Sequence, residues 1–193
     1  EPVNLTMNGR KNRISYRLVK LDKEERVVDL NKPQLLKGFN EVTKGNGYYK
    51  ARFSTAASPK ELIAGNYMLR SIYKAKNTDH VIYTMESFEQ YPDLHYATLD
   101  FKKSIRLTHG IDQQKDYLWG TAELVSWISL DGRKLEGVVY KPADFDPAKK
   151  YPMIVSFYER NSETLFNYRM PEPHRSTIDY HLYNSNGYIV FNP

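Results

Sequence analysis

The sequence contains no cysteine among its 193 residues. A disulfide framework, a thiolate nucleophile and a thiolate metal site are therefore excluded. The chain also lacks any uninterrupted apolar run near the roughly 20 residues that a membrane-spanning helix needs. Its opening EPVNLTMNGR has no apolar segment of the kind found in signal peptides. We therefore expect no membrane span, and a start without methionine in polar sequence indicates a mature or excised fragment.

Charge of one sign is not gathered anywhere in the chain. The 28 basic and 23 acidic residues give a net charge of +5 and are mixed along the sequence. Nucleic-acid binding proteins carry a basic patch or stripe, so we expect no nucleic-acid partner. The five histidines show no metal-ligand spacing, and neither a metal nor another cofactor is predicted.

Aromatic residues are plentiful, with sixteen tyrosines and eight phenylalanines, and 40% of all residues are hydrophobic. The chain can therefore bury a core, and its aromatic content favours strands. Short runs rich in β-branched and aromatic residues, separated by turn residues, extend to about residue 123 and predict an antiparallel meander. The predicted strands lie within residues 13–22, 25–30, 47–55, 67–76 and 80–88.

Two segments in this part are predicted to interrupt the strands. Leu35, Leu36 and Phe39 have helix-like spacing, so residues 32–47 are expected to form a short helical or irregular insertion. Residues 91–94, Tyr-Pro-Asp-Leu, are expected to form a turn. The strand spacing fits about two four-stranded blades of a β-propeller, and it fits a β-sandwich equally well.

The pattern changes near residues 120–123, where we place a domain boundary. Asp131 and Gly132 predict a hairpin between two strands within residues 124–142, because this dipeptide tolerates the positive φ of a hairpin turn. The segments after the hairpin, residues 151–158 and 188–193, are almost wholly apolar. Strands of this kind are typical of a parallel sheet that is covered on both faces.

A helix is predicted between these two apolar strands. Ile178, Leu182 and Tyr183 have helical spacing, and Asn186-Gly187 is a helix stop. Strand, helix and strand in this order predict two parallel strands. Such a small sheet would leave an apolar unpaired edge, which indicates that the chain is an excerpt of a longer polypeptide.

Residues 119–159, WGTAELVSWISLDGRKLEGVVYKPADFDPAKKYPMIVSFYE, carry a family resemblance. The Asp-Gly hairpin, the KP strand end, the FDP..KKYP connection and the apolar strand ending in tyrosine follow in that order. Together they resemble the junction between β-propeller and α/β-hydrolase domain in the prolyl oligopeptidase family of serine peptidases, in its dipeptidyl-peptidase-like branch. The resemblance implies a β plus α/β fold. Residues 1–122 would be the C-terminal part of a β-propeller, and residues 123–193 would be the first strands of an α/β-hydrolase domain.

The resemblance also implies an activity, that of a serine-type exopeptidase which hydrolyses short peptides by a Ser-His-Asp acyl-enzyme mechanism. No Gly-x-Ser-x-Gly elbow occurs in this chain, and in hydrolases of this topology the nucleophile, acid and base come after the point where it stops. Residues 1–193 alone are therefore expected to be inactive. A peptide substrate and a periplasmic or secreted location are favoured, and a homodimer is compatible with the resemblance.

Tyr158 is the site residue that the resemblance places within this chain. It matches the family tyrosine that follows the third strand of the hydrolase domain and donates its hydroxyl to the oxyanion. Open α/β sheets form their sites beyond the carboxyl ends of strands, so the position is physically sensible. The alternative is packing, as expected for most of the fifteen other tyrosines. Glu159 stands where many relatives have a small residue, which is a departure from the family pattern.

Other residues in this region have simpler interpretations. Glu159 and Arg160 are adjacent opposite charges, typical of a solvated loop. Ser156 and Ser162 have no elbow and no neighbouring histidine, so they are not predicted nucleophiles. His174 and His181 are predicted to be surface or packing groups.

Two other functions stay open beside the peptidase. The chain could be a non-catalytic β-rich binding module, or part of an esterase on the same hydrolase fold, because a fold does not determine a function.

Overall fold

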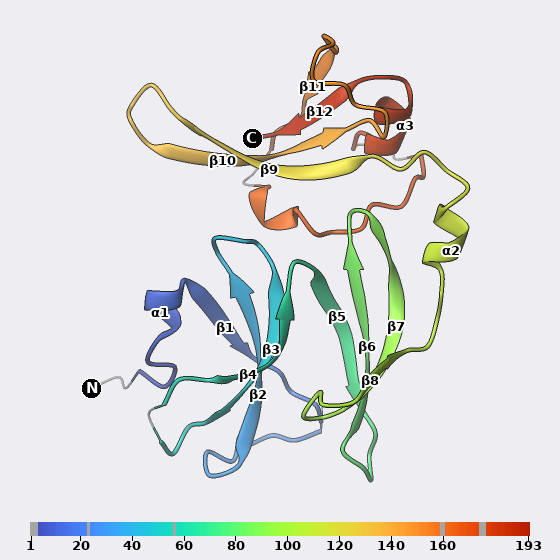
Figure 1. Ribbon diagram of the computed structural model, residues 1–193. Coiled ribbons are helices and arrows are strands. Elements are labelled where there is room, and N and C mark those ends of the chain that lie inside the picture. Colours follow the sequence, from blue (N-terminus) through green and yellow to red (C-terminus); the bar gives the residue numbers. More distant parts are fainter. Residues whose placement is uncertain (1–3, 23, 56, 159–160, 174–176) are drawn as a thin grey trace. The chain divides into compact units, whose positions relative to one another are not determined.

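The computed structural model describes residues 4–22, 24–55, 57–158, 161–173 and 177–193. In these residues the regular secondary structure is mostly β, arranged in three four-stranded sheets with a few short helices (Figure 1). The β-rich character expected from the aromatic content is confirmed. In chain order the elements are α1 (Gly9–Asn12), β1 (Ile14–Leu18), β2 (Pro33–Asn40), β3 (Asn46–Arg52), β4 (Lys60–Gly65), β5 (Met68–Lys74), β6 (His80–Ser87), β7 (Gln90–Thr98), β8 (Ser104–Arg106), α2 (Ile111–Gln114), β9 (Thr121–Ile128), β10 (Lys134–Lys141), β11 (Met153–Val155), the 3₁₀ helix η1 (Ser162–Thr164), α3 (Tyr180–Ser185) and β12 (Ile189–Asn192).

The chain divides into two compact units. One contains the residues up to Met85 together with Asp93–Thr108, and the other contains Glu86–Pro92 and His109–Pro193. The tip of the β6–β7 hairpin thus groups with the second unit. The assignment of residues 1–122 and 123–193 to two different domains stays a prediction.

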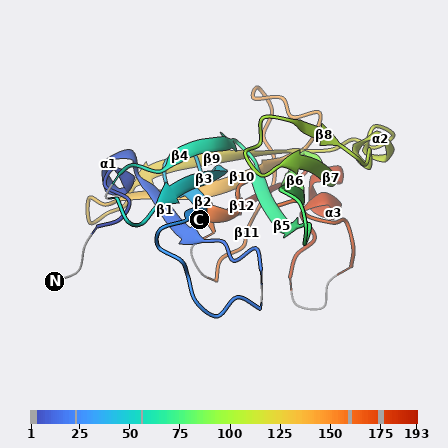
Figure 2. The ribbon, with the colours of Figure 1, turned by 90° about the horizontal axis from the view of Figure 1, so that it is seen from below.

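The first two sheets follow the predicted meander. β1 to β4 are hydrogen-bonded in chain order and are antiparallel throughout. β5 to β8 repeat this order, and the pair β7–β8 is antiparallel. Figures 1 and 2 show β1, β2 and β3 side by side.

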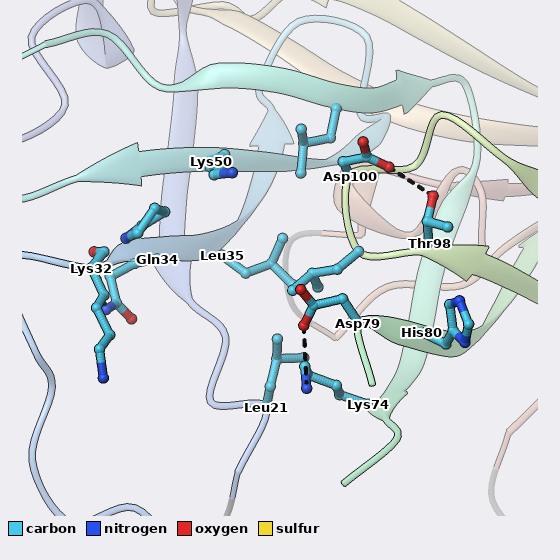
Figure 3. Close-up of a pocket in the computed structure, with 13 residues that line it drawn as sticks. Leu21, Lys32, Gln34, Leu35, Lys50, Lys74, Asp79, His80, Thr98 and Asp100 are labelled. Atoms are coloured by element: carbon cyan, nitrogen blue, oxygen red, sulfur yellow. Dashed lines mark hydrogen bonds and ion pairs between the residues drawn. The ribbon is translucent and has the colours of Figure 1, made fainter. Parts of the chain in front are cut away.

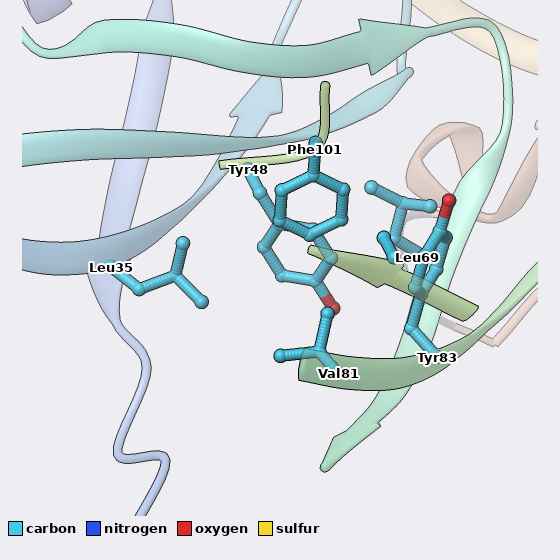
Figure 4. Close-up of a cluster of buried hydrophobic side chains, with 7 residues drawn as sticks. Leu35, Tyr48, Leu69, Val81, Tyr83 and Phe101 are labelled. Atoms are coloured by element: carbon cyan, nitrogen blue, oxygen red, sulfur yellow. The ribbon is translucent and has the colours of Figure 1, made fainter. Parts of the chain in front are cut away.

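The core of the first unit is built from residues of both sheets. Tyr48 of β3 stacks on Phe101 with ring centroids 5.3 Å apart and meets Tyr83 of β6 edge-on at 6.3 Å (Figure 4). Leu69 and Val81 complete this buried cluster from β5 and β6. Burying a large apolar side chain contributes about 1.5–3 kcal/mol, so these rings hold the two sheets together.

The prediction of a helical or irregular insertion at residues 32–47 is wrong, because β2 occupies Pro33–Asn40. Leu35 packs into the core that contains Tyr48, whereas Leu36 packs into a second cluster with Tyr49. Successive side chains of a strand point to opposite faces. A strand that is buried on both faces therefore shows adjacent leucines, a spacing that also suits a helix.

Residues 25–30 also differ from expectation, since this described segment contains no strand. The side chain of Val27 is 76% exposed. Asp29 accepts hydrogen bonds from the backbone N–H groups of Asn31 and Lys32. Such local turns compete with sheet pairing, and the segment is a loop.

The predicted strands do not include β4, which begins with the charged residues Lys60 and Glu61. The turn expected at residues 91–94 is wrong as well. These residues lie inside β7, and the chain reverses at Phe88 and Glu89. Pro92 has no N–H to donate to a neighbouring strand. Its place in β7 is compatible with the pairing to β8, because that pairing involves only His95–Ala97, beyond the proline.

The sheet of the second unit has the strand order β11-β12-β10-β9. The predicted hairpin is confirmed, because β9 and β10 are antiparallel and Gly132 has φ +79° in their turn. β11 and β12 are parallel, with Ile154 opposite Val190, as predicted. Val138, Tyr140 and Val190 form the core of this unit together with Phe88 and Leu165.

Helix α3 connects β11 to β12 and is shorter than the predicted pattern. The carboxylate of Asp179 accepts hydrogen bonds from the N–H groups of His181 and Leu182, which caps the helix N-terminus. Gly187, with φ +77°, follows the C-terminus. Among the described residues, no helix has the length and apolar character needed to cross a membrane.

Candidate active site

The carboxyl ends of β11 and β12 lie at one edge of the second unit's sheet. The parallel ladder pairs Met153 with Ile189 and Val155 with Phe191. It continues one residue further, because the Ser156 N–H donates to the Phe191 carbonyl at 2.9 Å. Phe157 and Tyr158 follow β11 beyond this edge, and Asn192 is the last residue of β12.

Tyr158 stands out from most of the other tyrosines by its exposure. Its side chain is 94% exposed, whereas Tyr48, Tyr83 and Tyr140 are fully buried. Within the described residues, Tyr158 has neither a hydrogen bond nor a ring contact. Its hydroxyl is therefore free to meet a ligand at the carboxyl edge of β11, and its ring contributes no packing within this part of the chain.

Tyr151, at the other end of the same segment, has a structural role instead. Its hydroxyl accepts the Asp146 N–H at 2.8 Å, and its ring packs on Phe145 at 5.1 Å. These contacts fix the connection that leads into β11, so the two tyrosines of this segment differ in what their hydroxyls do.

Buried and partly buried polar groups lie together at the end of β12. Asn192 is 1% exposed, and its amide donates to the Tyr180 hydroxyl at 2.7 Å. The Tyr180 ring stacks on Tyr140 at 4.5 Å, and the Arg169 guanidinium lies 5.2 Å from its centroid. Burial raises the pKa of the Tyr140 hydroxyl, although Arg169 acts in the opposite direction.

Sequence reasoning did not single out Asn192. A signal was present, because a polar side chain that ends an apolar strand needs a buried hydrogen-bond partner. Its amide anchors the last residues of β12 beside the edge where Tyr158 follows β11.

The loop after Tyr158 is partly described. Glu159 and Arg160, predicted to form a solvated pair, lie outside the described residues. Ser162 begins η1 and is buried, and the Thr164 hydroxyl donates to the Asn161 carbonyl at 2.8 Å. Ser156 takes part in the sheet ladder through its backbone.

His181 is a packing residue. Its ring stacks on Phe88 at 5.0 Å and lies 4.1 Å from Trp119, and its Nε2–H donates to the Arg169 carbonyl at 2.7 Å. Burial lowers the pKa of this histidine below its usual value. His174 lies outside the described residues, and the part of the chain that is described contains no metal-binding group of side chains.

The first unit contains a cavity of about 780 Å³ (Figure 3). Leucines such as Leu35 line it together with charged side chains of both signs. Lys74 pairs with Asp79 at 3.5 Å, and the Thr98 hydroxyl donates to Asp100 at 2.7 Å. Because both signs of charge line this cavity, its lining points to no single class of charged ligand.

Comparison with known proteins bears on the fold. No protein-family model and no curated protein sequence matches the chain. Solved structures do. Dipeptidyl peptidase 4 of Porphyromonas gingivalis is similar with a TM-score of 0.61 and 17% identity, over 92% of this chain and 24% of that one. A prolyl endopeptidase is similar with a TM-score of 0.56 and 15% identity, over 92% of this chain and 24% of that one. The acylaminoacyl peptidase of Pyrococcus horikoshii is similar with a TM-score of 0.54 and 18% identity, over 84% of this chain and 23% of that one.

The fold of the chain is similar to that of a part of these peptidase structures. The resemblance stated from the sequence is confirmed at this level. The chain spans only about a quarter of the length of these structures, between 23% and 24%.

Proposed function

We propose that the chain is part of a serine peptidase of the prolyl oligopeptidase family. In this proposal, residues 1–122 are the last blades of a β-propeller and residues 123–193 begin an α/β-hydrolase domain. The observation that carries it is the likeness to dipeptidyl peptidase 4, which extends over 92% of the chain and thus over both sheet types. The parallel pair β11–β12, which follows antiparallel sheets, supports the hydrolase assignment.

Tyr158 would supply an oxyanion donor in this enzyme. A phenol hydroxyl is a neutral donor, and it can be aimed at the charge that develops on a tetrahedral intermediate. One such donor contributes about 3–4 kcal/mol to transition-state stabilisation. Its exposure at the carboxyl end of β11 supports this role, since a ring without packing contacts leaves the hydroxyl to a ligand.

The reaction would follow the serine acyl-enzyme mechanism. A serine attacks the peptide carbonyl while a histidine takes its proton, and an aspartate orients the histidine. The nucleophile, acid and base are proposed to lie outside this chain, because its sequence contains no Gly-x-Ser-x-Gly elbow. Short peptides cleaved from one end are the proposed substrates.

Labelling with a fluorophosphonate tests the proposal. The 193-residue chain should neither react stoichiometrically nor hydrolyse a dipeptide amide, whereas the longer polypeptide that contains it should do both. Stoichiometric labelling of any serine in this chain would show that the catalytic centre is misplaced.

The same experiment separates the other two functions. A longer polypeptide that is never labelled would be a non-catalytic binding module. One that is labelled and cleaves esters but no peptide bond would be an esterase on the same fold.

A further inference from the structure

A second cavity, of about 810 Å³, lies within the second unit. It is bounded by the segment around α2, by residues near Tyr168 and by one side of α3. Apolar side chains such as Leu118 and Leu182 line it together with the rings of Tyr91, Tyr117 and Trp119. Its volume is within the usual range of about 300–1,000 Å³ for small-molecule sites.

The aromatic wall of this cleft is held in place by its own contacts. Trp119 and Tyr168 are stacked, with centroids 5.5 Å apart and an interplanar angle of 11°. Tyr91 meets Tyr168 edge-on at 5.4 Å. The Trp119 indole N–H donates to the Phe88 carbonyl at 2.8 Å. The wall is therefore preformed and does not need a ligand to order it.

Tyr117 differs from these rings, because its side chain is 71% exposed and belongs to none of the ring pairs. A cation placed over such an open aromatic face is attracted by the negative charge of the ring's π-system. The ring of Tyr117 therefore has a face open to a ligand, whereas Trp119 and Tyr168 cover one another where they stack.

Among the described residues that line the cleft, the charged side chains are all acidic. They are Asp116, Glu172 and Asp179, and no lysine or arginine is among the described lining residues. The two nearest cations in sequence are engaged elsewhere. Lys115 pairs with Asp112 at 2.5 Å, and the Arg169 guanidinium lies over the Tyr180 ring. The cleft thus combines an aromatic surface with negative charge.

We propose that this cleft binds a small organic cation, namely a primary amine attached to an aromatic or apolar body. The apolar body would lie on the aromatic wall, and the ammonium group would lie near Asp116 and the Tyr117 ring. The inference does not depend on the proposed peptidase activity, and its test requires none.

Three probes of one shape test the charge preference directly. Phenethylammonium carries a positive charge, 2-phenylethanol none and phenylacetate a negative charge. Trp119 reports binding in a Trp127→Phe background, since the chain has only these two tryptophans. We expect saturable binding of phenethylammonium, binding of the alcohol weaker by about fivefold, and still weaker binding of the carboxylate. Added salt should reduce the difference in affinity between phenethylammonium and 2-phenylethanol and leave the affinity for 2-phenylethanol unchanged.

Asp116→Asn locates the effect. It should weaken phenethylammonium binding by about two- to fivefold and leave 2-phenylethanol unchanged. The matched control is Asp144→Asn, which removes another exposed carboxylate of the same unit that does not line the cleft. Equal affinity for the amine and the alcohol, the absence of saturable binding up to about 20 mM, or equal effects of the two variants would each overturn the proposal.

Discussion

Single buried amides stabilise the second unit through side-chain hydrogen bonds. The Asn184 amide donates to the Tyr140 carbonyl at 3.1 Å and to the Tyr188 carbonyl at 2.9 Å. The side chain thus joins α3 to β10 and to the start of β12. At this scale sequence reasoning singled out Tyr158 through a motif and passed over Asn184 and Asn192, because the fold decides which groups these amides meet.

His181 makes the stability of the second unit depend on pH. Burial lowers the pKa of its ring below the unfolded value of 6.5, so the unfolded chain binds the proton more readily than the folded chain. Stability is therefore fully present above pH 6.5 and decreases as the pH falls towards the folded-state pKa. We expect a lower urea midpoint at pH 5.5 than at pH 7.5, followed by tryptophan fluorescence.

The control for this effect is His181→Gln, which keeps a side-chain N–H for the Arg169 carbonyl but does not titrate. Its urea midpoint should change less between the two pH values than that of the parent chain. An equally steep change would assign the pH dependence to other groups.

Secondary-structure elements were predicted well where local chemistry decides them and poorly where burial decides them. The Asp131-Gly132 hairpin and the end of α3 depend on glycine at positive φ, a requirement visible in the sequence. By contrast, β2 shows adjacent leucines because both its faces are buried. β4 begins with the exposed residues Lys60 and Glu61, so its pattern resembled a loop.

Gly187 provides a test at the scale of one element. It has φ +77°, and a Cβ added there would meet nothing within 4 Å, so only backbone strain opposes a substitution. The backbone N–H of Tyr188 bonds the Tyr183 carbonyl at 3.0 Å, which closes the helix end. We expect Gly187→Ala to reduce the free energy of unfolding by about 1 kcal/mol, measured by urea titration.

Gly187→Asn is the matched variant, because asparagine tolerates the left-handed region better than alanine does. Its loss of stability should be smaller than that of Gly187→Ala. If both substitutions had the same effect, steric contact rather than backbone conformation would be the cause.

At the scale of the whole molecule, the parallel pair β11–β12 after two antiparallel sheets agrees with the predicted change of pattern near residue 120. The likeness to much longer peptidases shows the fold, while the catalytic role of Tyr158 is part of the proposed function. In the proposed function, that role also needs a nucleophile, which is proposed to lie outside this chain.

Tyr151→Phe is the control for a test of this role. The Tyr151 hydroxyl accepts the Asp146 N–H. Removal of this hydroxyl should lower the free energy of unfolding by about 1 kcal/mol with little change in kcat. A large loss of turnover in this variant would show that the segment is sensitive to any change.

The most direct measurement is the kcat of Tyr158→Phe in the proposed longer peptidase, with KM and Tm determined alongside. Phenylalanine keeps the ring and removes only a hydroxyl that has no partner in the described part of the chain. If this hydroxyl stabilises the oxyanion, kcat should fall by about 10²- to 10³-fold, while KM and Tm change little. Full activity, or a loss explained entirely by unfolding, would contradict the assignment of Tyr158 to the active site.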